Sequence, residues 1–169
     1  RVIGDKRGRA SSKLLGKNPE LLDALRDRVG VPIRVIHHVR NPFDNIATMA
    51  RHGNESLAQA AERYFRFLRW TAAAFERLAP AERLDSYHED FVDDPATELR
   101  RLTRFLGVDA DGAYIQACCE KVFPSPRKSR DGFQWSPELT RSIEEQMAEF
   151  PHLAPYRRLA TEAEGESTR

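Results

Sequence analysis

Four dipeptides in which proline follows a small polar residue divide this chain into helices. In each, a side chain that can accept hydrogen bonds from a first helical turn precedes a residue whose missing N–H costs nothing there. The four dipeptides are Asn18-Pro19, Asn41-Pro42, Asp94-Pro95 and Ser136-Pro137. Apolar residues recur every three or four positions after each of them. We therefore predict an amphipathic helix after every dipeptide.

Glycine and apolar periodicity complete the predicted helices. Gly30 follows the first helix and Gly107 the third, at the position where a left-handed residue commonly ends a helix. Periodicity alone predicts a long helix over about 56–78 and another over 111–122.

Short runs rich in β-branched residues lie between these helices. Residues 32–39 are typical of a buried strand, and Val2-Ile3 and 84–87 are shorter candidates. The order strand, helix, strand, helix, helix, strand, helices favours an α/β fold with a parallel sheet flanked by helices. Because three strands make a thin sheet, we expect an upstream segment to supply more and the chain to be truncated at its N-terminus.

Length and composition limit the remaining possibilities. The 169 residues predict one domain over 1–160, followed by a polar, aperiodic tail over 161–169. No apolar stretch is long enough to cross a membrane, and a net charge of +1 argues against nonspecific nucleic-acid binding. The two cysteines, Cys118 and Cys119, are adjacent and rarely bridge each other, which favours a reducing, cytoplasmic compartment.

Two basic clusters are candidates for an anion site. Arg40 follows the predicted strand and precedes a helix N-terminus, and ligands bind at that edge of open α/β sheets. Thr48 lies about two turns along the helix, where its hydroxyl could reach the same pocket. The spacing fits equally an Arg40 that pairs with a nearby acid and a Thr48 on the surface.

The second cluster lies in a loop bounded by prolines and Asp131-Gly132. It contains Arg127, Lys128 and Arg130. Such a loop could fold over an anion, although charge-rich loops are more often solvated connectors.

Taken in order, these motifs resemble those of sulfotransferases over roughly residues 2–156. Residues 34–44, RVIHHVRNPFD, are similar to the strand-turn-helix that carries the 3′-phosphate arginine. Residues 87–107 resemble the family's Tyr-Glu-Asp-Leu, Asp-Pro and Phe-Leu-Gly series. The segment 127–129 with Trp135 downstream resembles the Arg-Lys-Gly loop and tryptophan that close over the nucleotide.

The resemblance implies a P-loop NTPase-like fold and a sulfuryl transfer from 3′-phosphoadenosine 5′-phosphosulfate (PAPS) that requires no metal. Adenosine 3′,5′-bisphosphate is the product, and the acceptor is a hydroxyl or amine of a small molecule, glycan or peptide. By the same resemblance, Arg40 and Thr48 bind the 3′-phosphate, and Arg127 and Lys128 grip it from the loop. Arg130 is an additional basic candidate without a counterpart in the family.

Other positions depart from the family pattern. Ser129 replaces the glycine of the closing loop. His88 stands where a tyrosine near adenine is usual, and a structural histidine is the alternative. Trp135 beside a helix start is expected to pack in the core.

Two candidate catalytic residues lie near the start of the chain. Lys6 is similar to a lysine that faces the sulfuryl group in many members, and a cation would stabilise charge on the leaving phosphate. Asp5 is a candidate base for the acceptor proton, since the histidine of cytosolic members is absent after Lys6. His37 and His38 fall inside a predicted strand, so we expect them to be structural and to face opposite sides.

A glycine-rich loop for the 5′-phosphosulfate is absent from these 169 residues. The sequence is therefore interpreted as the carboxyl-terminal portion of a sulfotransferase. Two alternatives stay open: a non-catalytic nucleotide-binding or interaction domain of the same fold, and a P-loop kinase of similar architecture.

Overall fold

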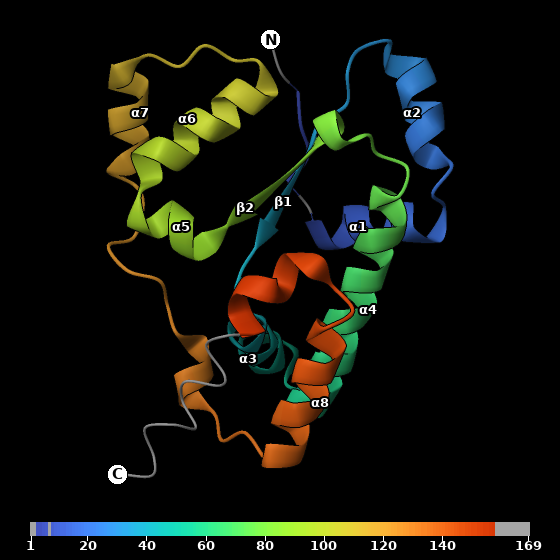
Figure 1. Ribbon diagram of the computed structural model, residues 1–169, viewed down its shortest axis with the longest axis vertical. Helices are drawn as coiled ribbons and strands as arrows, with labels where there is room; N and C mark the ends of the chain where they lie inside the picture. Colours follow the sequence, from blue (N-terminus) through green and yellow to red (C-terminus); the bar gives the residue numbers. More distant parts are fainter. Residues whose placement is uncertain (1–2, 7, 158–169) are drawn as a thin grey trace. The chain divides into compact units, whose positions relative to one another are not determined.

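A computed structural model of the chain describes residues 3–6 and 8–157 and is rich in helices (Figure 1). In chain order the elements are α1 (Gly8–Lys17), α2 (Leu21–Val29), β1 (Val35–Val39), α3 (Pro42–Gly53), α4 (Leu57–Phe75), η1 (Pro80–Glu82), β2 (Arg83–Tyr87), α5 (His88–Asp93), α6 (Pro95–Leu106), α7 (Gly112–Cys119), η2 (Ser129–Gly132), α8 (Pro137–Met147) and η3 (Pro151–Leu153). Strands β1 and β2 pair in a parallel sheet, which confirms the predicted fold class.

Three of the four predicted helix starts are confirmed by their caps. The Asn41 side chain accepts a hydrogen bond from the Phe43 N–H at 3.0 Å and opens α3. Asp94 accepts from the Thr97 N–H at 3.0 Å, and Ser136 accepts from the Leu139 N–H at 3.2 Å. Each cap satisfies a donor that the first helical turn would otherwise leave unpaired.

The prediction that Asn18-Pro19 caps a helix directly is wrong. The Asn18 side chain donates to the Leu14 carbonyl oxygen at 3.0 Å, so it contacts the last turn of α1. Its own carbonyl accepts from the Leu21 N–H at 3.1 Å, and α2 begins only at Leu21. The dipeptide is therefore a turn between two helices, the first of which the sequence did not predict. At the other end of α2, Gly30 takes the expected left-handed conformation, with φ of 61°.

The sheet differs from the prediction in one strand. β1 and β2 correspond to the predicted runs 32–39 and 84–87. Val2-Ile3 does not form the third: Ile3 lies outside any strand and is 88% exposed, and Val2 lies outside the described residues. Ile3 is followed by Gly4 and charged residues, which leave too few β-formers to pair. The predicted tail, 161–169, also lies outside the described residues.

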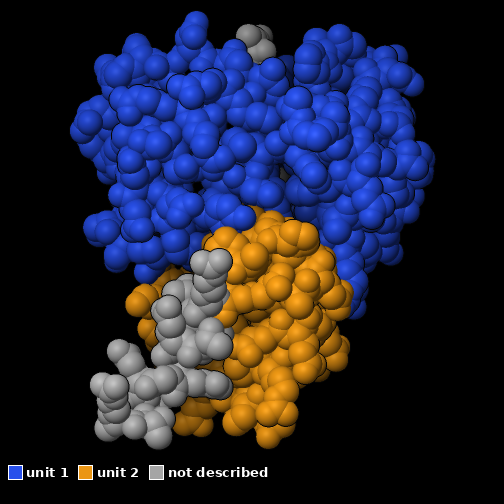
Figure 2. Space-filling model, in the orientation of Figure 1, with its two compact units in different colours: residues 1–38, 66–126 blue, residues 39–65, 127–169 orange. Residues whose placement is uncertain are grey.

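The described chain forms two compact units (Figure 2). The single domain over 1–160 stays a prediction. The first unit takes its described residues from 1–38 and 66–126 and contains most of the sheet. Its buried cluster is formed by Leu22, Ala74 and Leu78, with Leu15, Val35 and Phe75 packed against it.

The second unit takes its described residues from 39–65 and 127–169. Its buried apolar residues lie at the end of β1, in α3, in the first half of α4, in α8 and in or beside η3: Val39, Ile46, Ala47, Ala50, Ala60, Ala61, Tyr64, Phe65, Ile143, Met147, Phe150, Leu153 and Tyr156. The rings of Phe65 and Phe150 stack with centroids 6.1 Å apart. Within this unit η2 packs against α3, so the second basic cluster lies beside the helix that follows Arg40.

Candidate anion-binding site

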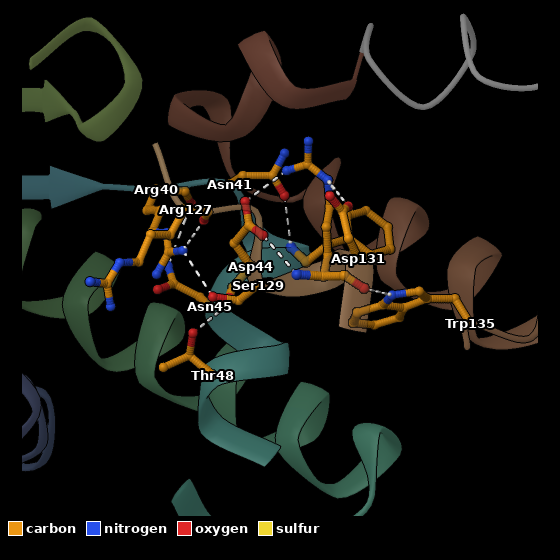
Figure 3. A network of polar contacts seen from close by, with 11 residues as sticks. Arg40, Asn41, Asp44, Asn45, Thr48, Arg127, Ser129, Asp131 and Trp135 are labelled. Carbon is orange, nitrogen blue, oxygen red and sulfur yellow. Dashed lines mark hydrogen bonds and ion pairs between the residues drawn. The ribbon is translucent and has the colours of Figure 1, made fainter. Parts of the chain in front are cut away.

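Arg40 joins the two basic stretches in the second unit. It lies between the end of β1 and the Asn41 cap of α3, and it is half-buried. Its Nη2 donates to the carbonyl oxygen of Arg127 and to the hydroxyl of Ser129, the latter at 3.2 Å (Figure 3). Two segments 87 positions apart in the chain therefore meet at one guanidinium.

The Nε of Arg40 is a buried donor for which no described residue supplies an acceptor. An unsatisfied buried donor is costly, and charged donors cost more than neutral ones. A ligand with anionic oxygens is one group that would satisfy it. This atom, together with the convergence at Nη2, makes Arg40 the centre of the candidate site.

The loop opposite Arg40 is fixed by contacts to the start of α3. Asp44, only 2% exposed, accepts a hydrogen bond from the Arg130 main-chain N–H at 2.9 Å and another from Arg130 Nη1 at 2.7 Å. Trp135 donates its indole N–H to the Arg130 carbonyl at 3.1 Å, and its ring packs edge-on against Phe43 (Figure 3). The expected packing role of Trp135 is thus present, although the ring is half-buried.

The remaining predicted phosphate ligands of this unit surround the same helix start. The Thr48 hydroxyl donates to the Asp44 carbonyl at 2.7 Å, the usual bond of a helical threonine to the preceding turn. Arg127 and Lys128 are exposed on the loop. The Arg130 guanidinium is paired with Asp44.

A second set of hydrogen bonds holds the backbone of Arg40. Asn45 donates to the Arg40 carbonyl at 3.5 Å, and Asn45 also hydrogen-bonds the buried hydroxyl of Tyr64. Burial raises the pKa of Tyr64 well above its ordinary value, so this hydroxyl stays neutral. The backbone carrying Arg40 is therefore tied to the core of the unit through neutral groups.

Lys6, Asp5 and His88 belong to the first unit. Lys6 is exposed, and its carbonyl accepts from the Gly8 N–H at 3.0 Å. Asp5 is exposed and accepts from the Ser11 hydroxyl at 2.8 Å, ahead of α1. His88 begins α5, and its Nδ1 lies 3.4 Å from Nε2 of His38.

The two strand histidines make separate contacts, as expected for structural residues on opposite faces. His37 Nδ1 lies 2.9 Å from the Asp85 carboxylate, and its ring meets Phe75 edge-on. His38 packs edge-on against His88 and Phe91. Partial removal from water and the neighbouring His88 lower the pKa of His38.

Sequence reasoning missed three contributors to the site. From the sequence, Asp44 has no role beyond its place in the 34–44 motif, Ser129 is only the replacement of a glycine, and Asn45 has no role. The placement of Asp44 in a first helical turn was visible, but its partner lies 86 positions away. Arg130 is predicted as a nucleotide ligand, but its guanidinium forms an ion pair with Asp44.

Two comparisons found known proteins that resemble this chain. The family model described as "Sulfotransferase family" matches residues 32–112, a range that contains β1, Arg40, α3 and β2. This part of the chain, just under half of its length, is similar to the sulfotransferase family. Among solved structures, the chain is similar to "mouse sulfotransferase SULT7A1 complexed with PAP", with a TM-score of 0.56 and 16% sequence identity. The match covers 76% of this chain and 62% of that chain, and at this identity it shows a shared fold.

No curated protein matched the sequence. Within 3–6 and 8–157, no helix has the length and apolar character to cross a membrane, and no group of three or more His, Cys, Asp or Glu side chains is placed to hold a metal. Cys118 and Cys119 are both free thiols.

Proposed function

We propose that this chain is part of a sulfotransferase, that it binds the 3′-phosphate of PAPS at Arg40, and that its protein transfers the sulfuryl group to a hydroxyl or amine acceptor. The observation that carries the proposal is the meeting of Arg40 with the 127–129 segment around a buried, unpartnered Nε. The similar mouse sulfotransferase is described as complexed with PAP, which supports a nucleotide of this class.

The residues present fit a phosphate monoester. Nε of Arg40 can donate to one phosphate oxygen, while Nη2 stays on the loop and holds the guanidinium plane. The Ser129 hydroxyl accepts from Arg40, which leaves its own proton for the ligand. Thr48 would join by rotating its hydroxyl away from the Asp44 carbonyl. Exposed Arg127 and Lys128 add charge that attracts an anion.

The donor, when bound, supplies an activated sulfuryl group whose departure leaves negative charge on a phosphate oxygen. In our proposal the ammonium of Lys6 stabilises that charge, and the Asp5 carboxylate takes the proton of the acceptor. In the same proposal, His88 lies against the adenine. The acceptor is a small molecule, glycan or peptide. The protein acts in the cytoplasm.

The decisive test is isothermal titration calorimetry of the full-length protein with adenosine 3′,5′-bisphosphate and with adenosine 5′-monophosphate. The two ligands differ only in the 3′-phosphate, so their affinity ratio reports the Arg40 site. We expect a loss of about 1.5 to 3 kcal/mol when either the 3′-phosphate or the Arg40 side chain is removed, the scale of a charged hydrogen bond.

Arg40→Ala should therefore weaken the bisphosphate and leave the monophosphate nearly unchanged. Arg141→Ala is the matched control, because Arg141 is an exposed arginine of the same unit that lies on α8. Equal affinity of the native protein for the two nucleotides would refute the proposal. Binding without sulfuryl transfer to any hydroxyl or amine acceptor would reduce it to nucleotide binding alone.

A further inference from the structure

Asp44 is an unusual residue to find beside a phosphate site. It is a carboxylate, it is 2% exposed, and it lies four positions after Arg40 in the first turn of α3. An unpaired negative charge at that place would repel an anion held by Arg40. The structure pairs this charge with a single residue, Arg130.

The two oxygens of Asp44 fix both parts of Arg130. Oδ1 accepts from the main-chain N–H at 2.9 Å, and Oδ2 accepts from Nη1 at 2.7 Å. The first bond sets the path of the backbone, and the second neutralises the carboxylate. Carboxylate pairing with two donors of one arginine residue is directional as well as strong.

The position of Arg130 also determines the groups that touch Arg40. Ser129 immediately precedes it and begins η2, and the Arg127 carbonyl lies three residues before Arg130, just ahead of η2. The η2 segment is stiffened by the bond from the Asp131 N–H to the Lys128 carbonyl at 3.2 Å. A shift of the backbone at residue 130 would therefore displace both acceptors of Arg40 Nη2.

We infer that Asp44 is a positioning residue for the phosphate site and that Arg130 serves the site through Asp44 instead of binding phosphate itself. This inference rests on the proposed function, because it assumes that Arg40 receives the 3′-phosphate. It reverses the role that the basic loop suggested for Arg130, whose Nη1 is already used on a buried carboxylate. Arg127 and Lys128 remain the loop cations directed to the nucleotide.

A double-mutant cycle separates the two roles of Arg130. The four full-length proteins are the native form, Asp44→Asn, Arg130→Gln and the double variant, each titrated with adenosine 3′,5′-bisphosphate and with the 5′-monophosphate. Arg130→Gln alone leaves the Asp44 charge unpaired, and we expect it to weaken the bisphosphate about tenfold with little effect on the monophosphate. In the Asp44→Asn background the charge is absent, and the same change should cost less than about threefold.

Asp131→Asn is the control variant, because Asp131 is 67% exposed and lies 3.9 Å from Arg130 Nε. It should change neither affinity. The ratio of the two affinities does not depend on the fraction of folded protein, so a merely structural defect would leave it unchanged. If Arg130→Gln does not fold by circular dichroism, Arg130→Met, which also removes the charge, takes its place in the cycle.

Each outcome has one meaning. A loss of the same size in both backgrounds would mean that Arg130 contacts the phosphate directly, and the inference would be wrong while the proposed function stands. A native protein that binds the two nucleotides equally would overturn the proposed function and this inference with it. A loss confined to the background that retains Asp44 supports both.

Discussion

Replacing Asp44 with alanine should destabilise the protein markedly, because this carboxylate connects two segments of the second unit. The side chain of Asp44 is 4% exposed, and both of its oxygens accept hydrogen bonds from Arg130 at 2.9 and 2.7 Å. Asp44→Ala removes both bonds and leaves the Arg130 N–H without its acceptor. It also leaves a small cavity at the start of α3.

The expected loss of stability depends on whether the two donors of Arg130 can bind water once the Asp44 carboxylate is gone. Breaking a buried ion pair by removing one partner costs about 3–5 kcal/mol when the remaining charge stays buried. Arg130 is 30% exposed, so its guanidinium can turn to water and recover part of that cost. The main-chain N–H of Arg130 is less free to turn to water. We therefore expect a decrease in the free energy of unfolding of about 2–3 kcal/mol for Asp44→Ala.

Urea denaturation followed by far-ultraviolet circular dichroism measures this decrease. Asp44→Asn keeps an oxygen for the Arg130 N–H and should lose about half as much. Asp131→Ala removes the exposed partner of Arg130 and should change stability by less than about 0.5 kcal/mol, as expected for a surface pair. If Asp44→Ala proved as stable as Asp131→Ala, the loop would not be held by Asp44 as we have argued.

Three further predictions test the core, a helix end and a titrating group. Phe65→Ala should lower the free energy of unfolding by about 3–5 kcal/mol in urea denaturation, since Phe65 is fully buried and stacks on Phe150. Gly30→Ala should cost about 1–2 kcal/mol by the same method, because its φ of 61° strains any residue with a Cβ even where space is open. The pKa of His38 lies below its ordinary 6.5, so its contribution to stability is present above that pH and is lost as the pH falls through the lowered value. Thermal unfolding between pH 7.5 and 5 should therefore depend less on pH in His38→Gln than in the native protein.

Local signals in the sequence predicted most of the helices. Asn41, Asp94 and Ser136 cap helices as expected, because an N-cap and the proline after it act within one turn of chain. The strand before Arg40 was equally visible as a β-branched run between two breakers. α1 was missed because its sequence, GRASSKLLGK, is mostly polar and contains Gly8 and Gly16 near its two ends.

Contacts between distant segments could not be predicted in the same way. The approach of Arg40 to Ser129 was suggested only by resemblance to a family, since nothing near Arg40 specifies a partner 89 positions away. The pairing of Asp44 with Arg130 was missed because an acid in a first helical turn is already explained by the helix dipole. Only the packing of η2 on α3 shows that Asp44 pairs with Arg130 and does more than complement the helix dipole.

The indole of Trp135 gives this protein its own optical reporter. Its N–H donates to the Arg130 carbonyl and its ring lies against Phe43, so its fluorescence depends on whether the loop rests on α3. The sequence contains two tryptophans, and the other, Trp70, lies in the first unit. A Trp70→Phe protein would therefore emit from the loop alone, and nucleotide arrival or loop release could be followed in real time without any attached dye.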